Sequence, residues 1–164
     1  MAGLVERIGH SGRIRHVRDT EYFEWRFQNP LSRYRFLYRD TDRLEGYLVL
    51  QEYTSESDKR DMVNIVDWEA TGTAAKAELL RAALRLIGSR RVVVWSATLT
   101  QETIDLLVRN RFSSDTPSSA MVQQCPGILV RAIHDQGEGE WLLGGLRLTD
   151  IANWDMRMLY SMSG

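Results

Sequence analysis

The spacing of apolar and polar positions first predicts a β-hairpin. Tyr34, Phe36 and Tyr38 alternate with arginines, which is the period-two pattern of a half-buried strand. Residues 40–42 (Asp-Thr-Asp) supply a polar turn, and Gly46–Tyr53 is expected to form the second strand. The pattern therefore indicates two antiparallel strands early in the chain.

A strand followed by a helix is the clearest signal in the middle of the chain. Met62–Trp68 is almost continuously apolar, which suits a central strand covered on both faces. Thr73–Ile87 is predicted to be a helix, because its apolar residues recur at three- and four-residue spacing. Thr73 is expected to be the N-cap and Gly88 to end the helix.

Shorter elements are predicted on either side of this unit. They are a helix capped by Asp19 or Thr20 and ending at Phe27, a strand at Arg91–Trp95, a helix from Thr100 to Arg109, and a strand at Gly127–Ile133. The segment from Trp141 to Tyr160 is rich in Leu and Trp and gives no clear pattern.

The order of elements predicts an α/β (α+β) fold. The early hairpin favours antiparallel pairing, and the later strand–helix–strand run favours a right-handed crossover between parallel strands. We expect a mixed, mostly antiparallel central sheet with helices on both faces. One domain is expected over residues 1–164, with an N-terminal extension (1–33), a core (34–133) and a C-terminal strand or tail (134–164).

Composition narrows the classes of partner. A net charge of −1 over 164 residues gives no reason to expect nucleic acid or a membrane surface as partner. No apolar run approaches the roughly 18 residues of a membrane span, and the first residues do not resemble a signal peptide, so the cytoplasm is expected. The lone Cys125 and the scattered His10, His16 and His134 match no thiol or metal pattern, so no metal is expected.

The turn after the central strand has features of an anion site. Small residues at 70–74 (Ala-Thr-Gly-Thr-Ala) connect the strand to the long helix, whose first N–H groups and dipole suit a phosphate. The same pattern also fits an ordinary strand-to-helix turn, and the residues alone leave both interpretations open.

On these residues the chain resembles the GNAT (Gcn5-related) N-acetyltransferase superfamily, as a divergent or C-terminal-half member. The resemblance covers Tyr34–Ile133. In that family a central strand leads into a pyrophosphate loop with the pattern Gln/Arg-x-x-Gly-x-Gly/Ala. Residues 69–74 (Glu-Ala-Thr-Gly-Thr-Ala) are similar to it at Gly72 and Ala74, and depart from it at Glu69.

The resemblance implies acetyl-CoA, or another acyl-CoA, as co-substrate. It also implies that the central strand offers backbone groups to pantetheine at Val66 and Trp68. The cofactor-binding residues that it implies are Val66, Trp68, Ala70, Thr71, Gly72, Thr73, Ala74 and Ala75. Ser96 and Thr98 are further candidates for holding the CoA arm or a substrate.

Asp67 and Glu69 are the candidate catalytic residues, because an acyltransferase needs a base for the amine proton. They lie two residues apart on one face of the strand. Paired carboxylates raise one another's pKa, which we expect to help a base work near neutrality. Glu52 is a further candidate base, and purely structural roles for the pair stay open.

Two functions follow from these observations. The first is acyl transfer from acyl-CoA to a small-molecule amine, a sugar amine or a peptide. The second is a catalytically inactive GNAT-like binding or assembly module. The second is suggested by Glu69 and by Arg111 and Leu107, which stand where the family places a glycine and a tyrosine. The Trp-rich tail would then be an interface, for instance in a homodimer.

Overall fold

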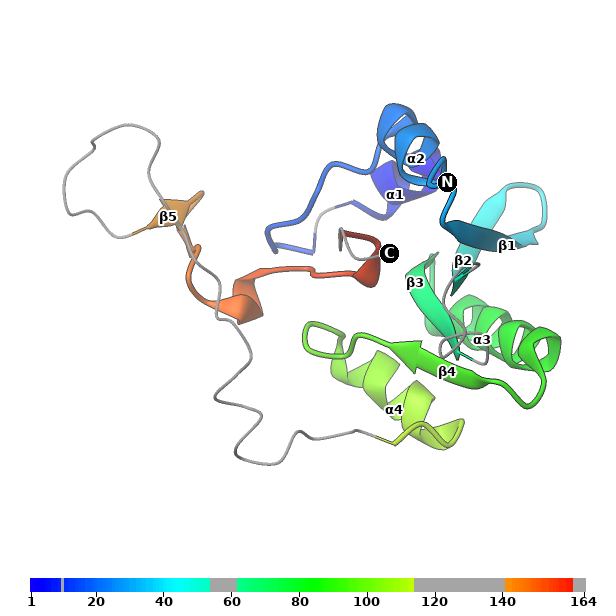
Figure 1. The fold of residues 1–164 in the computed structure, drawn as a ribbon. Helices are drawn as coiled ribbons and strands as arrows, with labels where there is room; N and C mark the ends of the chain where they lie inside the picture. Colours follow the sequence, from blue (N-terminus) through cyan, green and yellow to red (C-terminus); the bar gives the residue numbers. More distant parts are fainter. Residues whose placement is uncertain (10, 54–61, 114–140, 161–164) are drawn as a thin grey trace.

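A four-stranded sheet forms the centre of the protein (Figure 1). The structure is a computed structural model that describes residues 1–9, 11–53, 62–113 and 141–160. Its strands, in spatial order, are β1 (Ser32–Asp40), β2 (Leu44–Tyr53), β3 (Met62–Ala70) and β4 (Arg91–Val94). The pairs β1–β2 and β2–β3 are antiparallel, and β3–β4 is parallel. The prediction of a mixed, mostly antiparallel sheet is therefore confirmed.

Helices cover both faces of the sheet, as expected. On one face, α3 (Thr73–Ile87) and α4 (Gln101–Arg109) pack over Leu48 and Leu50. On the other, α1 (Ala2–Ile8) and α2 (Thr20–Arg26) pack over Tyr47 and Val49. The alternation of β2 side chains explains the two separate cores, because successive residues of a strand point to opposite faces.

The hairpin departs in one respect from the expectation of one core face and one wet face. The aromatic face of β1 is partly open, with Phe36 39% and Tyr38 54% exposed. The opposite face, which carries the arginines, also presents Leu37, which packs against the α3 core. Both faces of β1 are therefore partly covered, because helices lie on both sides of the sheet.

Several predicted boundaries shift by one residue, and some elements were not predicted. Gly72, and not Thr73, is the N-cap of α3, and no side chain caps that helix. The helix α1 had no strong periodic signal in its seven residues. Predictions for Cys125, His10, His134 and the strand Gly127–Ile133 lie outside the described residues. None of the helices in the described segments is long and apolar enough to cross a membrane.

The C-terminal tail forms a small hairpin and then returns to the sheet. The hairpin strands are β5 (Leu142–Leu143) and β6 (Leu146–Arg147), and the short 3₁₀ turns η2 (Ile151–Asn153) and η3 (Met158–Tyr160) follow. Leu159 in η3 is fully buried in the core under α1 and α2. The end of the tail is thus integrated into the domain beside β3, as Figure 1 shows.

A bulge in β3 opens the sheet on the side of β4. Val49 pairs with Asp67, whereas the next residue, Leu50, pairs with Ile65, so Val66 is an extra residue on β3. The parallel pairing with β4 ends at Ile65. Among the described residues, no strand therefore pairs with the last five residues of β3 on that edge, which creates room for a site.

The end of α4 explains an arginine in an unusual conformation. Arg111 has φ of 65°, in the left-handed region. Its N–H donates to the carbonyl of Val108, and the N–H of Phe112 donates to the carbonyl of Leu107. These two bonds form a Schellman motif, which normally carries glycine at the position of Arg111. This is the position where the sequence departs from the Gly-Phe ending of the GNAT family.

Replacing Arg111 with glycine is expected to stabilise the protein. A side chain in the left-handed conformation costs roughly 1–2 kcal/mol, and the flexibility of glycine in the unfolded chain offsets part of the gain. We expect Arg111→Gly to raise the free energy of unfolding by about 0.5–1 kcal/mol in denaturant titrations. The control Arg109→Gly, at the last helical residue of α4, should lower it, and a loss in Arg111→Gly would contradict the interpretation.

Candidate functional site

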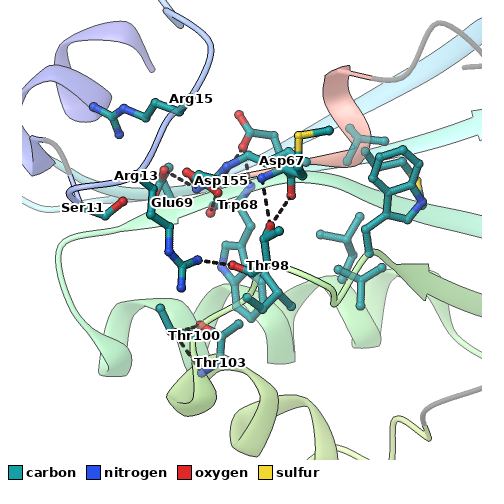
Figure 2. Close-up of a pocket in the computed structure, with 18 of the residues that line it drawn as sticks. Ser11, Arg13, Arg15, Asp67, Trp68, Glu69, Thr98, Thr100, Thr103 and Asp155 are labelled. Atoms are coloured by element: carbon teal, nitrogen blue, oxygen red, sulfur yellow. Dashed lines mark hydrogen bonds and ion pairs between the residues drawn. The ribbon is translucent and has the colours of Figure 1, made fainter. Parts of the chain in front are cut away.

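A pocket of about 310 Å³ lies where β3 and β4 diverge (Figure 2). Residues 65–69 at the end of β3 line one side, and residues 94–95 and 98–100 after β4 line another. The N-terminal segment contributes Arg13 and Arg15, and the tail contributes residues 155–158. Four parts of the chain that are far apart in sequence therefore meet at one opening in the sheet.

Asp67 lies fully buried beside this pocket and has no free oxygen. Its Oδ1 accepts hydrogen bonds from Arg18 Nη1 (2.9 Å), Arg157 Nη1 (2.8 Å) and the N–H of Trp68 (2.9 Å). Its Oδ2 accepts from the hydroxyl of Tyr47 (2.7 Å) and from Arg18 Nη1 (3.2 Å). The carboxylate is thus fixed in place by two guanidinium groups and a tyrosine.

Glu69 shares these two guanidinium groups but faces the pocket. Its Oε1 lies 2.5 Å from Arg18 Nη2 and 2.7 Å from Arg157 Nη2. No donor to Oε2 is found among the described residues, and the side chain is 9% exposed. Asp67 and Glu69 do lie on the same face of β3, as the sequence predicted, with the two arginines bound between them.

The expected mutual rise in pKa is wrong for Asp67. Burial alone would raise the pKa of this carboxyl, but the guanidinium groups of Arg157 and Arg18 and the Tyr47 hydroxyl hold its pKa below the usual value. The prediction considered the two carboxylates without the cations that lie between them. Asp67 is consequently an anion at neutral pH, and its surroundings suit a positioning role.

The backbone of Trp68 faces the opening but is already bonded inside the protein. Its N–H donates to Asp67 Oδ1, and its carbonyl accepts from Arg157 Nη1 at 2.8 Å. Val66 and Trp68, two of the predicted cofactor-binding residues, both line the pocket.

The other predicted cofactor-binding residues, 70–75, are not among the pocket-lining residues. They lie next to it, at the start of α3. Thr71, Gly72 and Ala74 are exposed there. A Cβ added to Gly72 would meet nothing within 4 Å, and its φ of −171° is open to any residue. The protein fold itself therefore does not require glycine at this position.

Charged groups surround the start of α3. Lys76 lines the pocket, its Nζ lies 5.4 Å from the centre of the Trp68 ring, and burial lowers the pKa of this amine. Thr73 donates a hydrogen bond to the carboxylate of Glu102 on α4. The helix start thus combines an uncapped positive dipole end with one cation and one competing carboxylate.

Sequence reasoning missed the two arginines that organise the site. Arg18 lies in a segment without periodicity, and Arg157 lies in the unassigned tail. A signal was present, since two carboxylates on a buried strand require cations. Because the chain contains many arginines, the sequence did not indicate which of them pair with Asp67 and Glu69.

Other candidate residues lie apart from this centre. Glu52 is at the opposite end of β2, paired with Arg35 and Arg90. Thr98 lines the pocket, whereas Ser96 does not. His16 stacks on Tyr160. Within the described segments, no group of three or more His, Cys, Asp or Glu side chains is arranged to hold a metal ion.

Comparison with protein families matches this architecture. A family model for an acetyltransferase (GNAT) domain matches residues 15–131. The chain belongs to the GNAT acetyltransferase family. GNAT domains generally use acyl-CoA as co-substrate, and the match begins well before Tyr34, so it includes α2 and the segment that carries Arg18. Neither the comparison with curated proteins nor that with solved structures found a match.

One position of this GNAT domain is the one at which the resemblance in the sequence places a tyrosine. Leu107 stands there, and it is buried in the core against α3, with 4% of its surface exposed. Leu107 is not among the residues that line the pocket. The position is used for packing in this chain.

Removing the Asp67 charge is expected to destabilise the protein strongly. Asp67→Asn leaves Arg18 and Arg157 with one buried carboxylate fewer, and breaking such a pair costs about 3–5 kcal/mol at pH 7. Because the pKa of Asp67 is lower in the folded state, its contribution is complete above about pH 5 and is lost as the pH falls toward that pKa.

The difference between wild type and Asp67→Asn should therefore narrow as the pH falls from about 5 to 3. Denaturant titrations of both proteins at several pH values measure this difference in the free energy of unfolding. Asp105→Asn on the exposed side of α4 is the control and should change stability by no more than about 0.5 kcal/mol. A constant difference across this range would contradict the network.

Proposed function

We propose that this GNAT domain transfers an acyl group from acyl-CoA, with acetyl-CoA as the simplest donor, to the amine of a small molecule, a sugar or a peptide. The observation that carries the proposal is the uncapped start of α3 beside the pocket at the end of β3. A 15-residue helix whose first N–H groups receive no side-chain cap offers those donors to a ligand phosphate.

The pyrophosphate of CoA fits the start of α3, at residues 70–75. The space around Gly72 leaves the backbone open to close approach. Lys76 adds a cation beside the helix start, and its Nζ donates to the Thr103 hydroxyl at 3.2 Å. The pantetheine arm would then enter the pocket along Val66 and Trp68, between β3 and β4.

Glu69 is the better placed of the two candidate bases. Its Oε2 has no donor among the described residues and the side chain lines the pocket, whereas both oxygens of Asp67 are bonded. In the proposed reaction the amine nitrogen attacks the thioester carbonyl, a C–N bond forms and the C–S bond breaks. Glu69 accepts the amine proton, and Asp67 holds the arginines that orient it.

The leaving thiolate takes its proton from solvent in this scheme. The position at which the family often carries a tyrosine is Leu107, in the core. A thiol has a pKa near 8.5, so the thiolate is a modest base that water can protonate without a dedicated side chain. The slow step is then expected to be the attack of the amine.

Calorimetric titration with acetyl-CoA tests the binding site. We expect micromolar binding by the wild type, and Gly72→Glu should weaken it at least tenfold by placing a carboxylate against the pyrophosphate. Leu86→Glu on the exposed side of the same helix is the matched control and should bind as the wild type does. Glu102→Gln, which removes a carboxylate near Thr73, should tighten binding.

A folded wild type that gives flat traces at millimolar acetyl-CoA would contradict acyl transfer. The assembly-module alternative would then become the better description. Equal weakening by Gly72→Glu and Leu86→Glu would place the pyrophosphate elsewhere, because only Gly72 lies at the helix start.

The base is tested by turnover with a panel of amines. Release of free CoA is followed with aliphatic diamines, an amino sugar and a lysine peptide as acceptors. For the amine that reacts, Glu69→Gln should lower kcat by about 10²- to 10⁴-fold with acetyl-CoA affinity retained. Glu78→Gln, on the exposed side of α3, is the control. Full activity in Glu69→Gln would show that another group accepts the proton.

A further inference from the structure

The tail covers the edge of β3 that the departure of β4 leaves open. Arg157 Nη1 donates to the carbonyl of Trp68, and its Nη2 lies 3.0 Å from Asp155 Oδ2 and 2.7 Å from Glu69 Oε1. The contacts with Trp68 and Glu69 join residues 89 and 88 positions apart in the sequence. The chain's own segment 155–158 therefore occupies the side of β3 where no strand of the described ranges pairs.

The same segment is held from the other side by Thr98, after β4. The N–H of Met156 donates to Thr98 Oγ1 at 2.9 Å, and the Thr98 hydroxyl donates to the carbonyl of Met156, also at 2.9 Å. Figure 2 shows Thr98 with these two bonds, next to Asp155 and Trp68. Thr98 is 7% exposed, so little water reaches this contact.

Both ends of the segment are held by other parts of the chain. On one side Ile14 pairs with residues 153 and 155 by backbone hydrogen bonds of 2.7 and 2.8 Å. On the other side Leu159 is fully buried, and its carbonyl accepts from Arg26 Nε at 2.6 Å. The contacts to Thr98 and Trp68 lie between these anchors, and a ligand with amide groups can replace these polar bonds. The ion pairs of Arg157 with Asp67 and Glu69 lie there too, and displacing Arg157 costs those pairs.

We propose that residues 155–158 form an autoinhibitory strap that closes the site and that acyl-CoA must displace in order to bind along β3. The inference rests on the proposed function, because it takes that site as the place of the acyl-CoA arm. The strap uses the Trp68 carbonyl and the Thr98 hydroxyl, two groups that a ligand lying between β3 and β4 would reach.

Displacement of the strap also changes the base. In the closed state Glu69 Oε1 is bound by the guanidinium groups of both Arg18 and Arg157. Withdrawal of Arg157 removes one of these two guanidinium groups from Glu69 Oε1 and so opens that oxygen to the amine. The strap thus couples access of the donor to activation of the residue that we assign as base.

Two variants loosen the strap at two different contacts. Thr98→Val keeps the shape of the side chain and removes both bonds to Met156. Arg157→Lys keeps the charge but, as a single ammonium group, cannot bond the Trp68 carbonyl and both carboxylates together. Each should tighten acetyl-CoA binding by about fivefold or more in calorimetry, because less must be broken on binding.

The control is Asp150→Ala, which removes a cap of the tail at Ala152, away from β3, and should leave the affinity unchanged. Hydrogen exchange provides a second readout on the wild type. The protection of the Met156 amide should fall when acetyl-CoA saturates the protein.

The outcomes separate the strap from the proposed function. Tighter binding in both variants, with loss of Met156 protection on saturation, supports the strap. Saturable binding by the wild type that is unchanged or weaker in both variants overturns the strap and leaves the acyl-CoA site standing, as does unchanged Met156 protection at saturation. Absence of binding in the wild type and in both variants overturns the proposed function, and the strap with it.

Discussion

A buried group of two carboxylates and two guanidinium groups holds the centre of this domain together. Asp67 and Glu69 come from the central strand β3, Arg18 from the segment before α2, and Arg157 from the tail. Moving such charges out of water costs several kcal/mol each, and only close pairing with further hydrogen bonds compensates. The geometry meets that condition at Asp67, which also receives the Tyr47 hydroxyl. The need to pair these buried charges therefore positions β3, the segment before α2 and the tail relative to one another.

The strands of the sheet and the helix α3 could be predicted from the sequence, because each has a local periodic pattern of apolar residues. The alternation around Phe36, the apolar run of β3 and the spacing within α3 each predicted an element that the structure contains. Arg111 was visible in the sequence as a departure from the glycine of the family pattern. Only the structure shows that this position is the left-handed residue of a Schellman motif at the end of α4. Boundaries shifted where backbone bonds, and not side-chain pattern, decide them, as at Gly72.

Only part of the site could be predicted from the sequence, and the reason is physical. Residues on β3 could be named because a strand fixes which side chains share a face. Their partners Arg18 and Arg157 lie in segments without periodicity and reach β3 only through the tertiary fold. The effect on chemistry was therefore missed, since Asp67 is stabilised as an anion where the carboxylate pair alone suggested the reverse. A sequence pattern locates carboxylates, and the fold decides which charge states they hold.

The order in which the network's members are synthesised has a consequence for how the domain forms. Arg18 is available when β3 emerges, but Arg157 is synthesised about 90 residues after Asp67. Until then the two carboxylates share one guanidinium group, and β3 has no cover beyond Ile65 on the side of β4. Domains fold largely as units during synthesis, and buried charge without a partner opposes compaction. The network around Asp67 and Glu69 is therefore complete only after Arg157 has been synthesised.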